Sequence, residues 1–335
     1  MTALPQLRAK DYASDQDVRW CPGCGDYAIL NAVQRVAQAL QLRREKTVFV
    51  SGIGCSSRFP YYMNTYGFHT IHGRAPGFVT GLKLANPDLD VWMITGDGDG
   101  LSIGGNHLIH LLRRNVDVNV MLFNNRIYGL TKGQYSPTSE VGKKTKSTPL
   151  GSLDTPIDPV RVALAAGASF VARSADKDRG LTGVLQAAAE HRGTSFVEIY
   201  QNCNIFNDGA FDELVNKDTR DDSVVLCEDG KPLKFGAGQS KGIRLNGLGA
   251  EVVELTEGNI SDDDLLFHDS SNPNLANLLS NLHPPEFPEP FGILYREERP
   301  CYEALVGGQV DAAIEKRGRG TLEQLLNAGD TYEIE

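Results

Sequence analysis

The sequence lacks a long hydrophobic run, a secretory signal and an excess of basic residues. No segment of its 335 residues approaches the roughly 18 apolar residues that span a bilayer. The first seventeen residues contain no apolar stretch of the kind found in signal peptides. Lysine and arginine number 33 against 43 aspartates and glutamates, and the net charge of −10 argues against nucleic acid as the main partner. We therefore expect an acidic, cytoplasmic protein that binds neither membrane nor nucleic acid.

Cysteine is also scarce, with six residues in all, and only one CxxC motif is present. The motif, CPGC, begins at Cys21. A zinc ribbon would require a second CxxC, and a thioredoxin-like pair would require a preceding strand, of which the sequence shows no convincing sign. Cys55 and Cys203 each follow an expected strand, so a parallel sheet could bring them to one edge, whereas Cys227 and Cys301 have no such argument. A four-cysteine iron–sulfur cluster and a pair of packed thiols are both open at this point.

Between residues 47 and 200, short apolar runs alternate with segments of helical periodicity. Most of these runs are continuously apolar, which is typical of strands buried on both faces. The expected strands cover residues 47–50, 91–94, 118–123, 170–172 and 196–200. The expected helices follow residue 25 and cover roughly 78–85, 106–114, 159–166 and 180–191. This alternation predicts an α/β fold with a doubly wound, mostly parallel sheet.

Two parts of the sequence break this rhythm. Residues 126–152 are polar, rich in Gly, Pro, Lys and Thr, and without apolar periodicity; loops of this length in a compact domain are usually functional or disordered. After about residue 205 the composition changes, and residues 224–227 and 232–235, joined by Glu-Asp-Gly, have the pattern of a hairpin. We predict a core domain over residues 1–205 and a C-terminal extension over 206–335 that wraps the core or a partner.

A Gly-Asp-Gly motif at residues 96–98 and an Asn-Asn pair at 124–125 follow two consecutive expected strands. Glycines at a strand–helix turn let the backbone approach a phosphate, and the helix N-terminus favours negative charge. Asp97 offers a carboxylate oxygen suited to Mg²⁺, and the amide oxygen of Asn125 can reach the same ion from the next strand. Each motif alone is also typical of an ordinary turn. Their combination, with 25 residues between them, predicts a diphosphate–Mg²⁺ site.

This combination resembles the thiamine diphosphate motif. Together with CPGCG at 21–25, GIGC at 52–55, IHGR at 71–74 and NNRIYGLTKGQYSPT at 124–138, it resembles the β subunit of a 2-oxoacid:ferredoxin oxidoreductase. The end of the last motif is most similar to the 2-oxoglutarate branch of that family. The resemblance covers about residues 15–215, is weaker in the C-terminal third, and implies the fold of a thiamine-diphosphate-binding domain.

The resemblance implies a specific set of site residues. A 4Fe–4S cluster would be bound by Cys21, Cys24, Cys55 and Cys203. Mg²⁺ would be held by Asp97, Asn125 and the backbone carbonyl of Ile127. The diphosphate would be lined by Gly96, Gly98, Asp99, Gly129 and Leu130. The residues nearer the thiazolium ring would be Ile53, Gly54, Cys55, Ser56, His72, Gly73 and Arg74. The expected catalytic residues are Arg58, His72 and Arg74.

Arg58 lies three residues after Cys55, close to where the thiazolium ring is expected. Its guanidinium could hold the second carboxylate of 2-oxoglutarate in a bidentate fork. Alternatively, Arg58 only balances the charge of the cluster.

The resemblance also implies a reaction and its partners. The chain would be the β subunit of 2-oxoglutarate:ferredoxin oxidoreductase, which converts 2-oxoglutarate and coenzyme A to succinyl-CoA and CO₂, a reversible reaction of the tricarboxylic acid cycle, and reduces ferredoxin. In this family the glutamate that activates the aminopyrimidine of thiamine diphosphate lies on the α subunit or domain. We therefore expect this chain to be active only with an α subunit, in an α2β2 heterotetramer.

Three alternatives remain. The first keeps the mechanism but changes the substrate to pyruvate or a branched 2-oxoacid. The second is a non-redox thiamine diphosphate lyase or carboligase in which the cysteines are structural. The third is a non-catalytic iron–sulfur or zinc scaffold. A brown anaerobic preparation would exclude the lyase, and bound thiamine diphosphate would exclude the scaffold.

Overall fold

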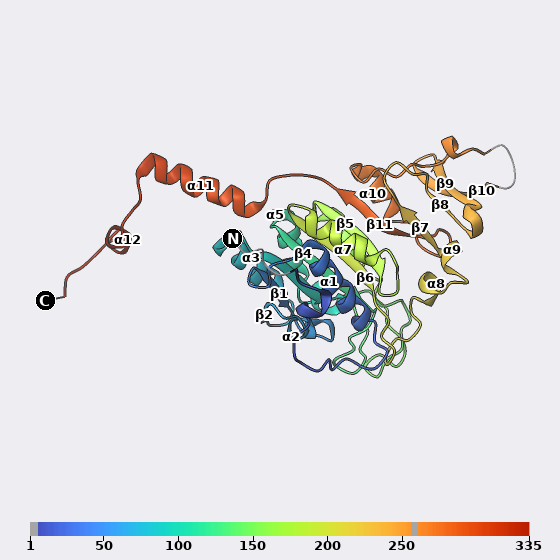
Figure 1. Cartoon of the computed structure of the whole chain (residues 1–335), viewed down its shortest axis with the longest axis horizontal. Helices are drawn as coiled ribbons and strands as arrows, with labels where there is room; N and C mark the ends of the chain where they lie inside the picture. The colour runs from blue at the N-terminus through green and yellow to red at the C-terminus, as the bar shows by residue number, and fades with distance from the viewer. Residues whose placement is uncertain (1–5, 256–259, 335) are drawn as a thin grey trace.

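The computed structural model describes residues 6–255 and 260–334, and an eight-stranded sheet forms its centre (Figure 1). The strands of this sheet are β1 Thr47–Ser51, β2 Tyr66–His69, β3 Asp90–Gly96, β4 Val118–Asn124, β5 Phe170–Ala175, β6 Thr194–Tyr200, β7 Val224–Cys227 and β11 Glu289–Arg296. Their order is β2-β1-β3-β4-β6-β5-β11-β7. Neighbouring strands are parallel except for β5 and β11, which pair antiparallel. The sheet is therefore mostly parallel, as the sequence predicts.

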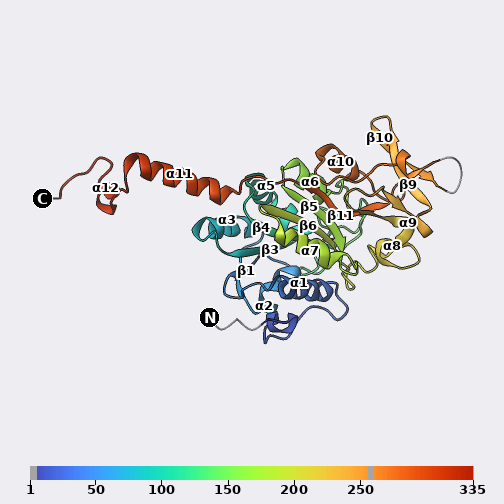
Figure 2. The same cartoon turned by 45° about the horizontal axis from the view of Figure 1, so that its top comes forward.

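Helices cover both faces of the sheet, and Figure 2 separates the two layers. One face packs against α1 Asp26–Leu40, α2 Phe59–Tyr62 and α7 Leu181–Glu190. The other packs against α3 Ala75–Ala85, α5 Gly105–Arg114, α6 Pro159–Ala165 and α10 Pro273–Leu279. Residues in β1 alternate between the layers: Phe49 belongs to the first core, and Val48 and Val50 to the second. Because both faces are covered, the central strands need apolar residues at nearly every position, which explains their continuous apolar runs.

The strand β2 was not expected from the sequence. It lies at the edge of the sheet beside β1, and all four of its residues are exposed. Its sequence, Tyr-Gly-Phe-His, lacks the continuous apolar run of the buried strands. An edge strand with no covering layer leaves no such signal, so periodicity alone does not reveal it.

The expected hairpin at residues 224–235 is wrong. The first half forms β7, which pairs in parallel with β11 at the end of the large sheet. The second half contains β8 Lys234–Phe235, which pairs with β9 Lys241–Asn246; β10 Gly249–Glu254 completes this separate three-stranded sheet. The Glu-Asp-Gly turn pattern is present in the sequence. However, burial of Val225 and Cys227 against a strand some sixty residues later decides which strand β7 pairs with. The domain boundary at residue 205 stays a prediction. The chain beyond this residue contributes two strands, β7 and β11, to the large sheet.

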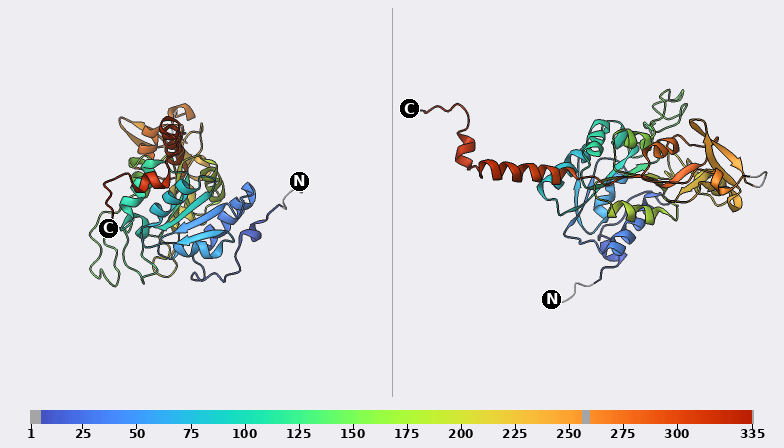
Figure 3. Two further views of the ribbon diagram at one scale, coloured as in Figure 1. Left: turned by 90° about the vertical axis from the view of Figure 1, so that its left-hand side faces the viewer. Right: turned by 90° about the horizontal axis from the view of Figure 1, so that it is seen from above.

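The remaining helices are short or lie outside the sheet layers. They are α4 Asp97–Leu101, α8 Asp212–Val215, α9 Arg220–Ser223, α11 Tyr302–Arg317 and α12 Leu322–Leu326. Both α11 and α12 project away from the body toward the C-terminus, as the right-hand view in Figure 3 shows. Among the described residues, no helix combines the length and apolarity that crossing a membrane requires.

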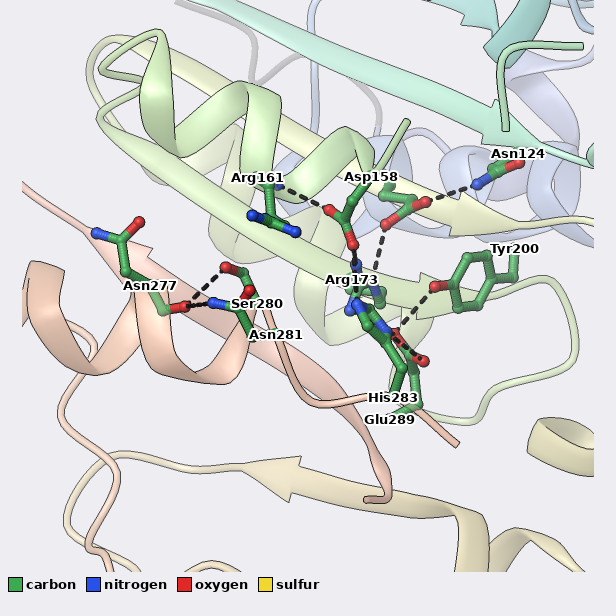
Figure 4. Close-up of polar contacts among 11 residues, drawn as sticks. Asn124, Asp158, Arg161, Arg173, Tyr200, Asn277, Ser280, Asn281, His283 and Glu289 are labelled. Carbon is green, nitrogen blue, oxygen red and sulfur yellow. Dashed lines mark hydrogen bonds and ion pairs between the residues drawn. The ribbon is translucent and has the colours of Figure 1, made fainter. Parts of the chain in front are cut away.

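A buried ion network joins the extension to the central strands (Figure 4). Arg173 on β5 is fully buried; its Nε lies 2.7 Å from Glu198 Oε2 and its Nη2 lies 3.2 Å from Asp158 Oδ2. Its Nη1 contacts Glu289 on β11. His283, just before β11, lies 3.1 Å from Asp158 through Nε2 and 3.0 Å from Glu289 through Nδ1. The network therefore attaches β11 to strands that carry the site described below.

We expect His283→Gln to destabilise the protein in a pH-dependent manner. Burial by itself lowers the pKa of His283, but hydrogen bonds to Asp158 and Glu289 raise it overall to about 9. Because this pKa lies above the unfolded value of about 6.5, the stabilisation is complete below about pH 6.5 and is lost as the pH rises through about 9. The side chain is 39% exposed, so solvent screening leaves a loss of only about 1 kcal/mol at pH 6.

Urea denaturation of wild type and variant at pH 6 and pH 10 measures this difference. Ser280→Ala is the matched control, because Ser280 is buried in the same extension and donates to Asn277 O, outside the network. Its effect should not depend on pH. A His283→Gln deficit of equal size at both pH values would show that the charge of His283 contributes nothing.

Candidate functional site

The candidate site lies at the C-terminal edge of β1, β3, β4 and β6. Strand register brings the residues after these strands together, because Gly96 pairs with Phe123, and Asn124 pairs with Tyr200. The segments that follow are Gly52 to Cys55, the α4 turn, the start of the 125–158 loop and the segment leading to Cys203. Open α/β sheets bind ligands at this edge.

A narrow pocket at this edge brings together most of the residues that the sequence proposes for the cofactor. It is lined by Ile53, Gly54, Cys55, Ser56, His72, Gly96, Asp97, Gly98, Asp99, Asn125, Ile127, Tyr128, Gly129, Leu130 and Thr131. Three proposed residues are not among them. Arg74 donates through Nη1 to Ile103 O, Gly73 donates its backbone N–H to Asp99, and Arg58 lies toward the cysteines. Tyr128 and Thr131 line the pocket without having been proposed.

Asp97 is one of two buried carboxylates that line this pocket and is 2% exposed. Its Oδ2 accepts hydrogen bonds of 2.6 Å from both Ser136 and Thr138, which lie in the long loop after β4. Burial raises the pKa of Asp97, and these hydroxyls partly offset the effect. Sequence reasoning missed Ser136 and Thr138, because their contact with Asp97 spans about forty residues of chain. These polar contacts thus attach the loop to the pocket.

Asp99 organises the loops around the pocket. Its Oδ1 accepts the backbone N–H groups of Ile53 at 3.1 Å and Gly73 at 2.8 Å, and lies 2.6 Å from His72 Nδ1. Its Oδ2 accepts from Thr95 at 2.7 Å. A Cβ at Gly52 would lie only 1.9 Å from Asp99 Oδ2, so this approach requires glycine. Asp99 therefore holds the GIGC and IHGR segments against α4.

Gly98 leaves room for an aromatic ring beside the backbone. A Cβ at this position would lie 2.3 Å from the ring of Tyr128, whose hydroxyl donates to Gly98 O at 2.7 Å. Tyr128 comes from the loop after β4, so it connects the two motifs across the pocket. Any side chain larger than glycine at position 98 would therefore collide with the Tyr128 ring.

The oxygen atoms at the pocket fit a hard cation shared with a diphosphate. Asp97 supplies a carboxylate, Asn125 an amide oxygen and Ile127 a backbone carbonyl, the ligand types that Mg²⁺ prefers. Within residues 6–255 and 260–334, no group of three His, Cys, Asp or Glu side chains is placed to hold a metal ion. A Mg²⁺ with one protein carboxylate would complete its shell with neutral oxygens and phosphate, which is a common arrangement.

Four cysteines line a second cavity of about 300 Å³ next to the pocket. They are Cys21, Cys24, Cys55 and Cys203. Gly129 adjoins this group, because a Cβ there would lie 3.5 Å from Cys55 Sγ and 3.7 Å from Cys203 Sγ. Cys227 is on β7 and Cys301 precedes α11, and neither lines the cavity. The cysteines that sequence reasoning grouped therefore share a cavity, and the other two do not.

Because no three of these described side chains are placed to hold one metal ion, the cavity fits a cluster better than a single ion. A cubane takes each cysteine on a separate iron, so the ligand sulfurs are spread around the cluster rather than converging on one point. Burial and the nearby Asp26 carboxyl raise the pKa of Cys55 to about 12, so its free thiol is neutral. Metal binding must therefore deprotonate it, as is usual for thiolate ligands.

The two cavities meet at shared residues and open on a wider cleft. Four residues line both the narrow pocket and the cysteine cavity: Cys55, Asn125, Gly129 and Leu130. Leu130 also borders an open cleft of about 580 Å³. Arg58 lines this cleft and the cysteine cavity, and its Nη1 donates to Arg19 O at 3.0 Å. A molecule in the cleft would thus face the pocket and Arg58 together.

Comparisons with known proteins identify the family and relatives that the chain resembles. A family model for the thiamine pyrophosphate enzyme C-terminal TPP binding domain matches residues 52–199. The 2-oxoglutarate oxidoreductase subunit KorB of Mycobacterium tuberculosis is 54% identical over 340 residues, covering 100% of this chain and 90% of that protein. The 2-oxoglutarate synthase subunit KorB of Archaeoglobus fulgidus is 45% identical over 185 residues, covering 55% of this chain and 69% of that protein.

One solved structure is similar along almost the whole chain. It is a 2-oxoglutarate:ferredoxin oxidoreductase from Magnetococcus marinus with 2-oxoglutarate, coenzyme A and succinyl-CoA bound. The two chains superimpose with a TM-score of 0.76 at 33% identity, covering 98% of this chain and 97% of the other. The similarity thus includes the C-terminal third, where the sequence motifs are weak.

Proposed function

Because this chain belongs to the family of 2-oxoacid:ferredoxin oxidoreductase β subunits, we propose that it is the β subunit of a 2-oxoglutarate:ferredoxin oxidoreductase. The reaction is the oxidative decarboxylation of 2-oxoglutarate with coenzyme A to succinyl-CoA and CO₂, with ferredoxin as electron acceptor, and it is reversible. The full-length similarity to the mycobacterial subunit supports the choice of 2-oxoglutarate among 2-oxoacids.

The observation that carries this proposal is the adjacency of the two cavities. A pocket suited to a diphosphate cofactor shares Cys55 with a cavity lined by four cysteines. Oxidation of a 2-oxoacid releases two electrons at one carbon, whereas an iron–sulfur cluster accepts one at a time, so the two groups must lie close together. A lyase has no need of the second cavity, and a scaffold has no need of the first.

The residues of the chain have distinct roles in this proposal. Asp97, Asn125 and the carbonyl of Ile127 would hold Mg²⁺. Ser136 and Thr138 would keep the Asp97 carboxylate oriented through their hydroxyls. When bound, thiamine diphosphate supplies the electron sink that decarboxylation of a 2-oxoacid requires. The four cysteines would hold one 4Fe–4S cluster beside it.

The site is incomplete without a partner in this proposal. No glutamate lines the narrow pocket in the part of the chain that the structure describes. The glutamate that activates the cofactor would therefore come from an α subunit, in a cytoplasmic α2β2 complex. Coenzyme A and ferredoxin would act on that complex.

Anaerobic co-purification followed by viologen reduction tests the function. We expect a brown complex that contains a second subunit and reduces viologen with 2-oxoglutarate and coenzyme A faster than with pyruvate. A colourless complex with bound thiamine diphosphate would contradict the redox assignment. A preference for pyruvate would contradict the substrate assignment alone.

We expect Arg58→Gln to lower kcat/KM for 2-oxoglutarate while sparing pyruvate. Arg58 faces the open cleft beside the pocket, where its guanidinium can pair with the second carboxylate of 2-oxoglutarate. A charge-assisted hydrogen bond contributes roughly 1.5–3 kcal/mol, or about 10- to 150-fold in rate. Steady-state kinetics with both substrates measure the change.

Arg19→Gln is the matched control for this variant. Arg19 borders the same cleft, but its side chain is 72% exposed and pairs with Asp17. We expect little change in the kcat/KM of Arg19→Gln for either substrate. An equal fall for both substrates in Arg58→Gln would assign Arg58 to balancing the charge of the cluster instead.

A further inference from the structure

Gln201 is a buried side chain that contacts both parts of the site. It follows β6 directly and is 1% exposed. Its Oε1 accepts a 2.9 Å hydrogen bond from Asn125 Nδ2, and its Nε2 donates to Cys24 Sγ at 3.2 Å. The second N–H of the same amide donates to Asn202 O at 2.6 Å. One carboxamide thus spans from a proposed Mg²⁺ ligand to a proposed cluster ligand.

The contacts determine the orientation of this amide. A flipped carboxamide would place Nε2 against the Asn125 donor and Oε1 against the Asn202 carbonyl, which are two repulsive pairs. The orientation of Asn125 follows from that of Gln201. With its Nδ2 held by Gln201, the Oδ1 of Asn125 accepts the Ile127 N–H at 3.2 Å and is the atom available to a hard cation. Groups that orient metal ligands in this way affect metal affinity strongly.

The same amide addresses an electrostatic problem at Cys24. Gln201 Nε2 donates to Cys24 Sγ at 3.2 Å, and the carboxyl of Asp26, two residues further along the chain, is only 1% exposed. A cluster ligand carries negative charge, and the reduced cluster carries one negative charge more than the oxidised cluster. An N–H directed at the sulfur favours the more negative state, and hydrogen bonds to cluster sulfurs are a recognised determinant of reduction potential.

We propose that Gln201 is a positioning residue for both groups: it orients Asn125 toward the metal through Oε1 and raises the reduction potential of the cluster through Nε2. This inference rests on the proposed function, since it presupposes the cofactor and the cluster. Its consequence is that one side chain sets the geometry of the cofactor site and the readiness of the adjacent cluster to accept an electron.

Two variants separate the two contacts. Gln201→Leu removes both, so we expect a lower midpoint potential and an approximately tenfold loss of Mg²⁺–thiamine diphosphate affinity. Gln201→Glu keeps an oxygen opposite Asn125 Nδ2 but lacks the amide donor to Cys24. We expect it to bind the cofactor within about threefold of wild type and to show a lower midpoint potential. The measurements are anaerobic redox titration of the cluster and titration of cofactor-free complex with thiamine diphosphate and Mg²⁺.

Asn204→Leu is the matched control. Asn204 borders the same cysteine cavity and donates to Pro22 O at 2.6 Å, but it contacts neither Cys24 nor Asn125 through its amide. We expect its midpoint potential and cofactor affinity to stay near those of wild type. General loosening of the cavity would not lower the midpoint potential of Gln201→Glu while leaving its cofactor affinity near that of wild type.

The outcomes distinguish this inference from the proposed function. A wild-type complex without cluster or cofactor would contradict the function before any variant is made. Wild-type potential in Gln201→Glu, or equal shifts in Gln201→Leu and Asn204→Leu, would overturn the role of Gln201 alone. If Gln201→Leu assembles too little cluster to titrate, the potential of Gln201→Glu decides the question by itself.

Discussion

Asp97→Asn is expected to abolish Mg²⁺-dependent binding of thiamine diphosphate while the spectrum of the cluster persists. Asp97 is the only charged group among the three proposed Mg²⁺ ligands. Replacing it with a neutral side chain therefore leaves the charges of the metal ion and the diphosphate poorly balanced. Asparagine keeps the size of the side chain, and its Oδ1 can still accept from Ser136 or Thr138. We expect affinity to fall by at least about 100-fold, as measured by titration of the cofactor-free complex.

The best control lies at the far end of β3, the strand that Asp97 directly follows. Asp90→Asn makes the same chemical change at the first residue of β3, where the side chain is exposed and distant from the pocket. Asp99 is a poor control, because it holds Ile53 and Gly73 in place and its loss should disturb the loops themselves. Wild-type affinity in Asp97→Asn would remove Asp97 from the metal site.

Replacing any one of the four cavity cysteines with serine is expected to cause loss of the cluster and of viologen reduction. The four residues come from three separate segments and line one cavity, so each missing thiolate leaves one iron without its ligand. The measurement is iron and sulfide content of each anaerobically purified single variant. The variants are Cys21→Ser, Cys24→Ser, Cys55→Ser and Cys203→Ser.

Two further cysteines serve as matched controls. Cys227 and Cys301 are 7% and 8% exposed, so replacing them tests the effect of a buried cysteine-to-serine change away from the cavity. Both variants should retain iron, even if their stability falls. Loss of iron in Cys227→Ser together with retention in Cys203→Ser would overturn the ligand assignment.

The elements that positioned the site were predictable because their signals are local. Strands buried on both faces need continuous apolar runs, and such runs placed β1, β3, β4 and β6 within a few residues of their observed bounds. Parallel strands then bring their C-terminal ends to one edge. Gly-Asp-Gly and Asn-Asn could therefore be assigned to one site, and Cys55 and Cys203 to one cavity, before any contact was known.

Contacts between distant residues were not predictable, because they leave no periodic or local pattern. Thr138 bonds to Asp97, 41 positions away, and Arg173 reaches Glu289 across 116 positions. Thr138 ends one of the motifs that carry the family resemblance, but no local pattern indicates that its hydroxyl contacts Asp97. The hairpin expected at 224–235 failed for the related reason that a distant strand, β11, competes with the local turn for β7.

The sequence by itself thus determined the layered α/β architecture, the edge of the sheet at which the site is proposed, and the cysteines and oxygen-bearing residues proposed as ligands there. Only the tertiary structure decided which other side chains contact these residues, Gln201 above all. The physical reason is partly the register of β4 against β6, which sets Asn125 beside Gln201. The segment that contains Cys24 reaches Gln201 separately, where the Gly25 N–H donates to Asn202 O at 3.1 Å. Register depends on how two strands far apart in the chain pack between common helices, so it is settled when the whole sheet assembles.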